Sequence, residues 1–173
     1  MRTLFTLVSA GTIAALLISA ASAKDMEEDI TLDKVPKAVL DAAKARFKGA
    51  NFLGAAKETD KEKGDQLVYE VSLKHKGQRI DALFTPGGEM FLYEAQITAR
   101  DLPPAVAKTL DEKYPKATYK LYEQLYKVEN KKEKLECYEV QLETADTKKA
   151  MEVQVSEAGK IIKAAKASGE GLQ

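Results

Sequence analysis

The five residues VPKAV at positions 35–39 occur again, with few changes, as LPPAV at positions 102–106. Downstream of each copy lies a second shared pentapeptide, YEVSL at 69–73 and YEVQL at 138–142. Each match is short, but the two motifs keep their order and nearly keep their spacing. Such self-similarity is typical of a fold built from repeated supersecondary units. The sequence therefore predicts two copies of one structural unit.

The two predicted units run from residue 32 to 97 and from residue 99 to 167. Near the end of each unit a glycine precedes a short apolar stretch, Gly88 in the first unit and Gly159 in the second. Glycine is among the residues that most often mark turns. We therefore predict that each of these glycines leads the chain through a turn into the last strand of its unit.

Each unit is predicted to begin with a helix. Apolar residues recur at helical spacing behind Pro36 in the first unit and behind Pro103 in the second. A proline is well tolerated at the front of a helix, because the first backbone N–H groups there have no partner within the helix. The residues of the two helical patterns are Val39, Leu40, Ala43 and Phe47, then Val106, Leu110 and Tyr114.

After each helix, apolar residues alternate with polar ones, which is the pattern of a strand with one buried face. Turn residues divide each unit into about four strands, of which the first, around residues 50–58 and 117–128, has the weakest pattern. The predicted fold class is α+β, with two tandem helix-plus-antiparallel-sheet repeats. These repeats form one broad curved sheet that carries helices on one face and polar side chains on the other.

The N-terminus has the three parts of a secretory signal peptide. Arg2 supplies a positive charge, residues 4–21 carry no charge, and small residues occupy Ala21 and Ala23. We predict a signal peptide at residues 1–23, with cleavage after Ala23 and export to the periplasm or the medium. A permanent membrane anchor is the alternative. The predicted flanks of the mature protein are a flexible segment at residues 24–31 and a disordered tail at residues 168–173.

Composition narrows the classes of function. Lys+Arg and Asp+Glu both number 27, and this balance argues against nucleic-acid binding, which requires a basic surplus. Cys137 is the only cysteine and His75 the only histidine, so no nucleophile–base pair or histidine–cysteine metal site is indicated. No common catalytic or nucleotide-binding motif occurs. We therefore predict no catalytic residue, no metal and no cofactor, and expect that the protein is not an enzyme.

The helix motif, the Tyr-Glu-Val strand and the closing strand behind a glycine together resemble PepSY-like repeats, in the tandem arrangement likened to beta-lactamase inhibitory protein. The resemblance covers about residues 32–167. It implies an exported protein whose two helix-plus-sheet units form a curved sheet. Related modules occur in propeptides of thermolysin-type metallopeptidases and are thought to restrain peptidases. The resemblance implies no catalytic residues.

The sequence also indicates which residues could contact a partner. Tyrosines are favoured at interfaces because they bury area while keeping a polar tip in water. If the strand has no bulge, Tyr122 and Tyr126 lie on one face and Tyr119 on the other, so at least one set points away from the helix. Packing in the core is the alternative role for these tyrosines. Polar residues predicted on the outward sheet face, and hence at the partner, are Glu70, Arg79, Glu139, Gln141 and Glu152.

Three functions remain open from the sequence. The first is a binding module that docks another exported protein on its sheet, such as a peptidase inhibitor or modulator. The second is an envelope protein that sequesters a small ligand or a peptide, which a deep apolar pocket between the units would favour. The third is an enzyme with an unrecognised site, which would need a buried carboxylate pair with shifted ionisation.

Overall fold

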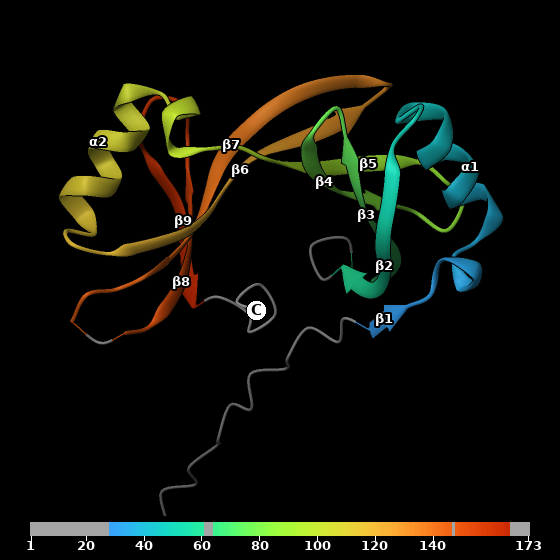
Figure 1. Cartoon of the computed structure of the whole chain (residues 1–173), viewed down its shortest axis with the longest axis horizontal. Coiled ribbons are helices and arrows are strands. Elements are labelled where there is room, and N and C mark those ends of the chain that lie inside the picture. The colour runs from blue at the N-terminus through green and yellow to red at the C-terminus, as the bar shows by residue number, and fades with distance from the viewer. Residues whose placement is uncertain (1–27, 61–63, 147, 167–173) are drawn as a thin grey trace, which may run out of the picture.

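The structure of the chain, a computed structural model, describes residues 28–60, 64–146 and 148–166. Within these residues nine strands form one antiparallel sheet, and each strand pairs with its neighbours in sequence. Figure 1 shows the helices α1 and α2 at opposite ends of the molecule, with the long strands β6 and β7 reaching across between them. The strands are β1 (Glu28–Ile30), β2 (Asn51–Asp60), β3 (Gln66–His75), β4 (Gln78–Phe84), β5 (Met90–Gln96), β6 (Thr118–Glu129), β7 (Lys132–Glu143), β8 (Ala150–Val155) and β9 (Ile161–Lys166).

The order of the elements agrees with the predicted α+β class. A short 3-10 turn, a helix and four strands occur twice in succession along the chain. Strands β5 and β6 pair directly, with Tyr93 opposite Tyr126, so both sets of four strands belong to one sheet. The helical elements are η1 (Leu32–Lys34), α1 (Lys37–Arg46), η2 (Ala99–Asp101) and α2 (Pro104–Lys113). The unit boundaries at residues 97 and 99 stay a prediction.

Each helix covers its own set of strands. Val39 and Ala43 of α1 are buried in a cluster with apolar residues of β3, β4 and β5. Val106 and Leu110 of α2 are buried in a second cluster with residues of β7 and β8. The strand register carries the buried positions of the first cluster into the second, so both helices lie on the same side of the sheet. No helix among the described residues has the length and apolarity needed to cross a membrane.

The turns before β5 and β9 pack closely against the starts of the helices. Gly88 has φ +87° and Gly159 has φ +81°, a region that side chains disfavour. A Cβ on Gly88 would lie 2.5 Å from the carbonyl oxygen of Ala38, and a Cβ on Gly159 would lie 2.6 Å from that of Ala105. The glycines matched in the sequence therefore let each turn touch its helix.

The segment before η1 differs from the prediction. A flexible segment is predicted at residues 24–31, but Glu28–Ile30 form β1 at the edge of the sheet. Ile30 packs against the first core cluster, and Lys57 Nζ lies 2.8 Å from Glu28 Oε2. A strand of three residues is too short to show alternation, which explains why the sequence pattern did not indicate it. Residues 1–27 and 167–173, which include the predicted signal peptide and tail, lie outside the described residues.

Candidate functional site

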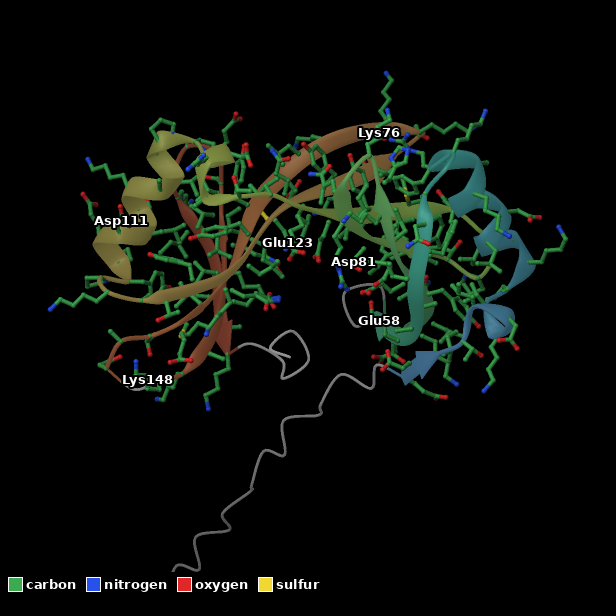
Figure 2. All side chains as sticks on the ribbon, viewed as in Figure 1. Glu58, Lys76, Asp81, Asp111, Glu123 and Lys148 are labelled. Atoms are coloured by element: carbon green, nitrogen blue, oxygen red, sulfur yellow. The ribbon has the colours of Figure 1, made fainter. Side chains whose placement is uncertain are left out.

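The side of the sheet that faces away from both helices, here called the open face, gathers polar side chains from both sets of strands. Register places Ser72 beside Asp81 and Asp81 beside Glu94, then Glu123 beside Glu139 and Glu139 beside Gln154. In Figure 2, Asp81 and Glu123 lie between the two ends of the molecule, whereas Asp111 lies on α2 at its outer end. The open face also carries Glu70, Arg79, Gln141 and Glu152.

Three glutamates converge near the middle of the open face. Glu94 comes from β5, Glu123 from β6 and Glu139 from β7, and a carboxylate oxygen of each lies within 4.8 Å of those of the other two. Glu123 is 4% exposed and Glu139 is 6% exposed. We call these three residues the carboxylate cluster. Strand pairing fixes their backbones, so the convergence belongs to the fold and does not depend on a loop.

Burial and mutual repulsion make the cluster difficult to ionise. Burial, reinforced by Glu139 and Asp81 and opposed by Arg79, raises the pKa of Glu123 to about 7. Burial and the neighbouring carboxylates also raise the pKa of Glu94 well above its usual value. The pKa of Glu139 is raised in the same way, by burial and by Glu152, although Gln154 Nε2 donates to Glu139 Oε2 at 2.8 Å. Negative charge here is therefore costly unless a cation or a proton offsets it.

Asp81, on the neighbouring strand β4, differs from the carboxylate cluster because its carboxylate has hydrogen-bond and ion-pair partners. Arg79 Nε donates to Asp81 Oδ2 at 3.1 Å, and Arg79 Nη2 donates to Asp81 Oδ1 at 3.3 Å. The hydroxyl of Ser72 also donates to Asp81 Oδ1. Asp81 is only 9% exposed, but it has a bidentate guanidinium partner of opposite charge. Arg79 and Ser72 therefore offset the loss of hydration of Asp81, whereas the carboxylate cluster has no such cationic partner in contact within the described part of the chain.

The tyrosines of β6 lie on the other side of the sheet. Tyr126 stacks on Tyr93, with ring centroids 4.8 Å apart, and packs against the first core cluster. Tyr122 and Tyr119 stack at 5.8 Å and pack against the second cluster. The prediction that at least one set points away from the helices is wrong, because the register shifts between Tyr119 and Leu121. This bulge returns Tyr119 to the helix-covered side.

The polar residues predicted for the outward face do lie on it. Arg79 binds Asp81, Glu139 belongs to the carboxylate cluster, and Gln141 lies directly opposite Glu152 on β7 and β8. Glu70 is on the same face, beside Ser72. These residues are thus brought together, but Tyr122 and Tyr126 are separated from them by the thickness of the sheet. Whether any of them contacts a partner stays a prediction.

Glu94 and Glu123 are absent from the predicted set, although they form the centre of the open face. A glutamate inside a strand, such as Glu94 between Tyr93 and Ala95, is a usable signal on its own. The convergence with Glu139 could not be predicted from the sequence, because it depends on how β5 pairs with β6 and how β6 pairs with β7. It provides the buried carboxylates with shifted ionisation that the enzyme hypothesis requires.

A cavity of about 730 Å³ lies on the helix-covered side, between α1, the β4–β5 turn and the end of the β6–β7 hairpin. Ala42, Phe84, Met90 and Val128 give it an apolar lining. At its rim Arg46 forms an ion pair with Glu133, which also accepts a hydrogen bond from Tyr93 Oη at 2.8 Å. The cavity joins the first unit to the second and is the kind of concave site that a small-ligand hypothesis requires.

Solved structures of other proteins have a similar fold. A BLIP-like protein from Bacteroides fragilis superposes with a TM-score of 0.56 at 18% identity, over 79% of this chain and 89% of that one. A "putative periplasmic" protein from Bacteroides eggerthii superposes with a TM-score of 0.60 at 15% identity, over 78% of this chain and 90% of that one. At these identities the likeness concerns the fold. No curated protein matches the chain.

The family described as "Putative beta-lactamase-inhibitor-like, PepSY-like" matches residues 22–92 and again residues 68–163. The two matched segments together span most of the sequence, and each contains one of the helices with most of its strands. The likeness to PepSY-like repeats predicted from the motifs is confirmed. The chain belongs to this PepSY-like family.

Proposed function

We propose that the protein is an exported, non-catalytic binding module that docks another exported protein on the open face. The observation that carries this proposal is the sheet itself: two sets of strands join into one surface, and both helices cover only its other side. A broad sheet face with fixed charges suits a folded protein surface better than a small molecule. Inhibition or modulation of a peptidase is the specific form of this function that the family likeness favours.

The charges of the open face indicate which kind of partner surface would complement it. Carboxylates dominate it, and Arg79 is already engaged by Asp81. A surface that presents lysine or arginine side chains would complement this arrangement, and such complementarity sets specificity and association rate. A role of Tyr122 and Tyr126 in binding concerns the helix-covered side. It requires a partner that also reaches around the edge of the sheet.

The ionisation of the cluster argues against catalysis. An acid–base pair needs two groups whose environments move their pKa values apart. Here the pKa values of Glu94, Glu123 and Glu139 are all raised, so no member of the cluster is kept reliably ionised as a base or nucleophile. The arrangement suits the binding of positive charge better than the transfer of protons.

Export is the first part of the proposal to test. The endogenous protein, isolated from the envelope or medium of its own cells, is expected to begin at Lys24, because signal peptidase would cut after Ala23. N-terminal sequencing together with intact mass measures this directly. A chain that retains Met1 and stays in the membrane fraction would contradict cleavage and favour the anchor alternative.

Docking is tested by affinity capture from envelope extract with residues 24–173 as bait. One bait variant combines Gln141→Ala with Glu152→Ala, which truncates two neighbouring side chains on the open face. The matched control combines Lys108→Ala with Glu112→Ala, an exposed pair on α2. Wild type and control are expected to recover the same partner. The open-face variant should bind that purified partner at least about tenfold more weakly, the size of effect typical of interface anchors.

Equal affinity of all three baits for the recovered protein would contradict docking on the open face. Native mass spectrometry of the endogenous protein distinguishes the alternative. A small molecule that co-purifies, with no protein recovered specifically by any bait, would favour ligand sequestration in the cavity beside α1.

A further inference from the structure

We infer that the carboxylate cluster is a binding site for a divalent cation that prefers oxygen ligands, Ca²⁺ above others. Glu94, Glu123 and Glu139 would be its protein ligands. The site would lie in the middle of the open face, where the two sets of strands meet. This inference goes beyond the proposed docking function and does not depend on it.

The spacing of the three carboxylates fits such an ion. Calcium binds oxygen at about 2.3–2.6 Å, so two oxygens on opposite sides of the ion lie about 4.6–5.2 Å apart. The ligand oxygens of the cluster all lie within 4.8 Å of one another. They come from three adjacent strands of one sheet, so an ion could be bound through side-chain adjustments while the backbone stays in place.

Glu123 supplies the second observation. Its side chain is 4% exposed, yet it has no hydrogen-bond or ion-pair partner among the residues that the structure describes. An ionised carboxylate that is buried without a partner is strongly disfavoured, because no interaction offsets the loss of its hydration. Asp81, which is similarly buried, has Arg79 and Ser72 bound to it. The fold thus places a counter-charge in contact with Asp81, whereas Arg79 acts on Glu123 only at longer range.

The cluster can be reached from the open face. Among the described residues, the only fully enclosed side-chain polar atom without a partner is Tyr119 Oη, so the oxygens of Glu123 retain some contact with the surface. Entry of an ion therefore requires no opening of the core.

The donor set selects the class of ion. All three candidate ligands are carboxylates, which suit hard cations better than zinc or copper. Three carboxylates that can bind through one or both oxygens match the six to eight ligands of Ca²⁺. Mg²⁺ demands a tighter octahedron and gives up its water molecules reluctantly. Two positive charges would also offset most of the three negative ones.

Thermal unfolding of residues 24–173, in EDTA and in 5 mM CaCl₂, tests the inference, with calorimetric titration of Ca²⁺ as the direct readout. The wild-type melting temperature is expected to rise by about 2–8 °C with Ca²⁺, for a dissociation constant of about 0.1–1 mM. Glu123→Gln is expected to melt higher than wild type in EDTA, because it removes a repelled charge. It should gain nothing from Ca²⁺.

Glu112→Gln is the matched control, since it removes the same charge from an exposed position on α2. It should keep the wild-type response to Ca²⁺. The inference is overturned if the wild type neither binds nor responds to Ca²⁺, which would leave protons or a partner's lysine as the counter-charge. An equal response in Glu123→Gln would overturn it too, because the ion would then bind elsewhere. Both outcomes concern the isolated protein and leave the capture experiment intact as a separate test of docking.

Discussion

In EDTA, the free energy of unfolding of the wild-type protein is expected to fall by about 2.5 kcal/mol as the pH rises from 5 to 8. The cause is Glu123, whose pKa rises from 4.5 in the unfolded chain to about 7 in the folded protein. The folded state then holds the proton more tightly than the unfolded state. Between pH 4.5 and pH 7, Glu123 ionises in the unfolded chain but stays protonated in the folded protein, so the folded state loses stability as the pH rises. Above pH 7 Glu123 is ionised in both states, and the loss of stability no longer grows. Solvent screens only part of this loss, because Glu123 is 4% exposed.

Burial is the main cause of the raised pKa of Glu123, and the charged groups around it modify the effect. Glu139 on β7, Asp81 on β4 and Glu152 on β8 raise the pKa of Glu123, and Arg79 on β4 is the cation that lowers it. The pKa of Glu94 is raised as well, so its contribution has the same direction.

Urea unfolding at pH 5, 6, 7 and 8 measures this pH dependence. Glu123→Gln should reduce it, because the amide does not titrate, whereas Glu112→Gln on α2 should leave it unchanged. A wild-type stability that stays constant from pH 5 to pH 8 would show that Glu123 ionises normally.

The fold was largely accessible from the sequence because its signals are local. The proline before each helix, the apolar residues at helical spacing and the Tyr-Glu-Val strands depend only on neighbours along the chain. The helices α1 and α2 begin one residue after Pro36 and Pro103, and end just before Phe47 and Tyr114, the last residues of the predicted patterns. Their matched order also allowed the family likeness to be predicted.

Only part of the candidate site could be predicted from the sequence, and β6 shows why. Strand alternation assigned Glu139, Gln141 and Glu152 to the correct face. It failed for Tyr119, because a bulge adds one residue and reverses the alternation. Glu123, on the same strand, becomes notable only when the fold pairs it with Glu139 and brings the carboxylate of Glu94 close to both. Bulges and cross-strand neighbours are set by tertiary packing, which no single strand encodes.

The matched glycines give the second large expected effect. Gly88→Ala is expected to lower the free energy of unfolding by about 3 kcal/mol, and Gly159→Ala by a similar amount. Positive φ costs an alanine about 1–2 kcal/mol, and forcing a methyl group into a packed site costs about 1–3 kcal/mol more. The methyl group on Gly88 would lie 2.5 Å from the carbonyl oxygen of Ala38. The methyl group on Gly159 would meet the carbonyl oxygen of Ala105 in the same way. Because backbone atoms cannot turn aside as a side chain can, the turn or the helix must move.

Gly77→Ala separates the two contributions. Gly77 lies in the β3–β4 turn with φ +88°, nearly the value of Gly88, but a Cβ there would meet nothing within 4 Å. It should therefore show the backbone strain alone, a loss of about 1–2 kcal/mol. Urea unfolding of the three variants gives the comparison. Equal losses at Gly77 and Gly88 would mean that the β4–β5 turn does not press on α1, and the packing of that turn against the helix start would have to be abandoned. A larger loss at Gly88 and Gly159 than at Gly77 would show that the same close contact between a glycine turn and a helix fixes both α1 and α2.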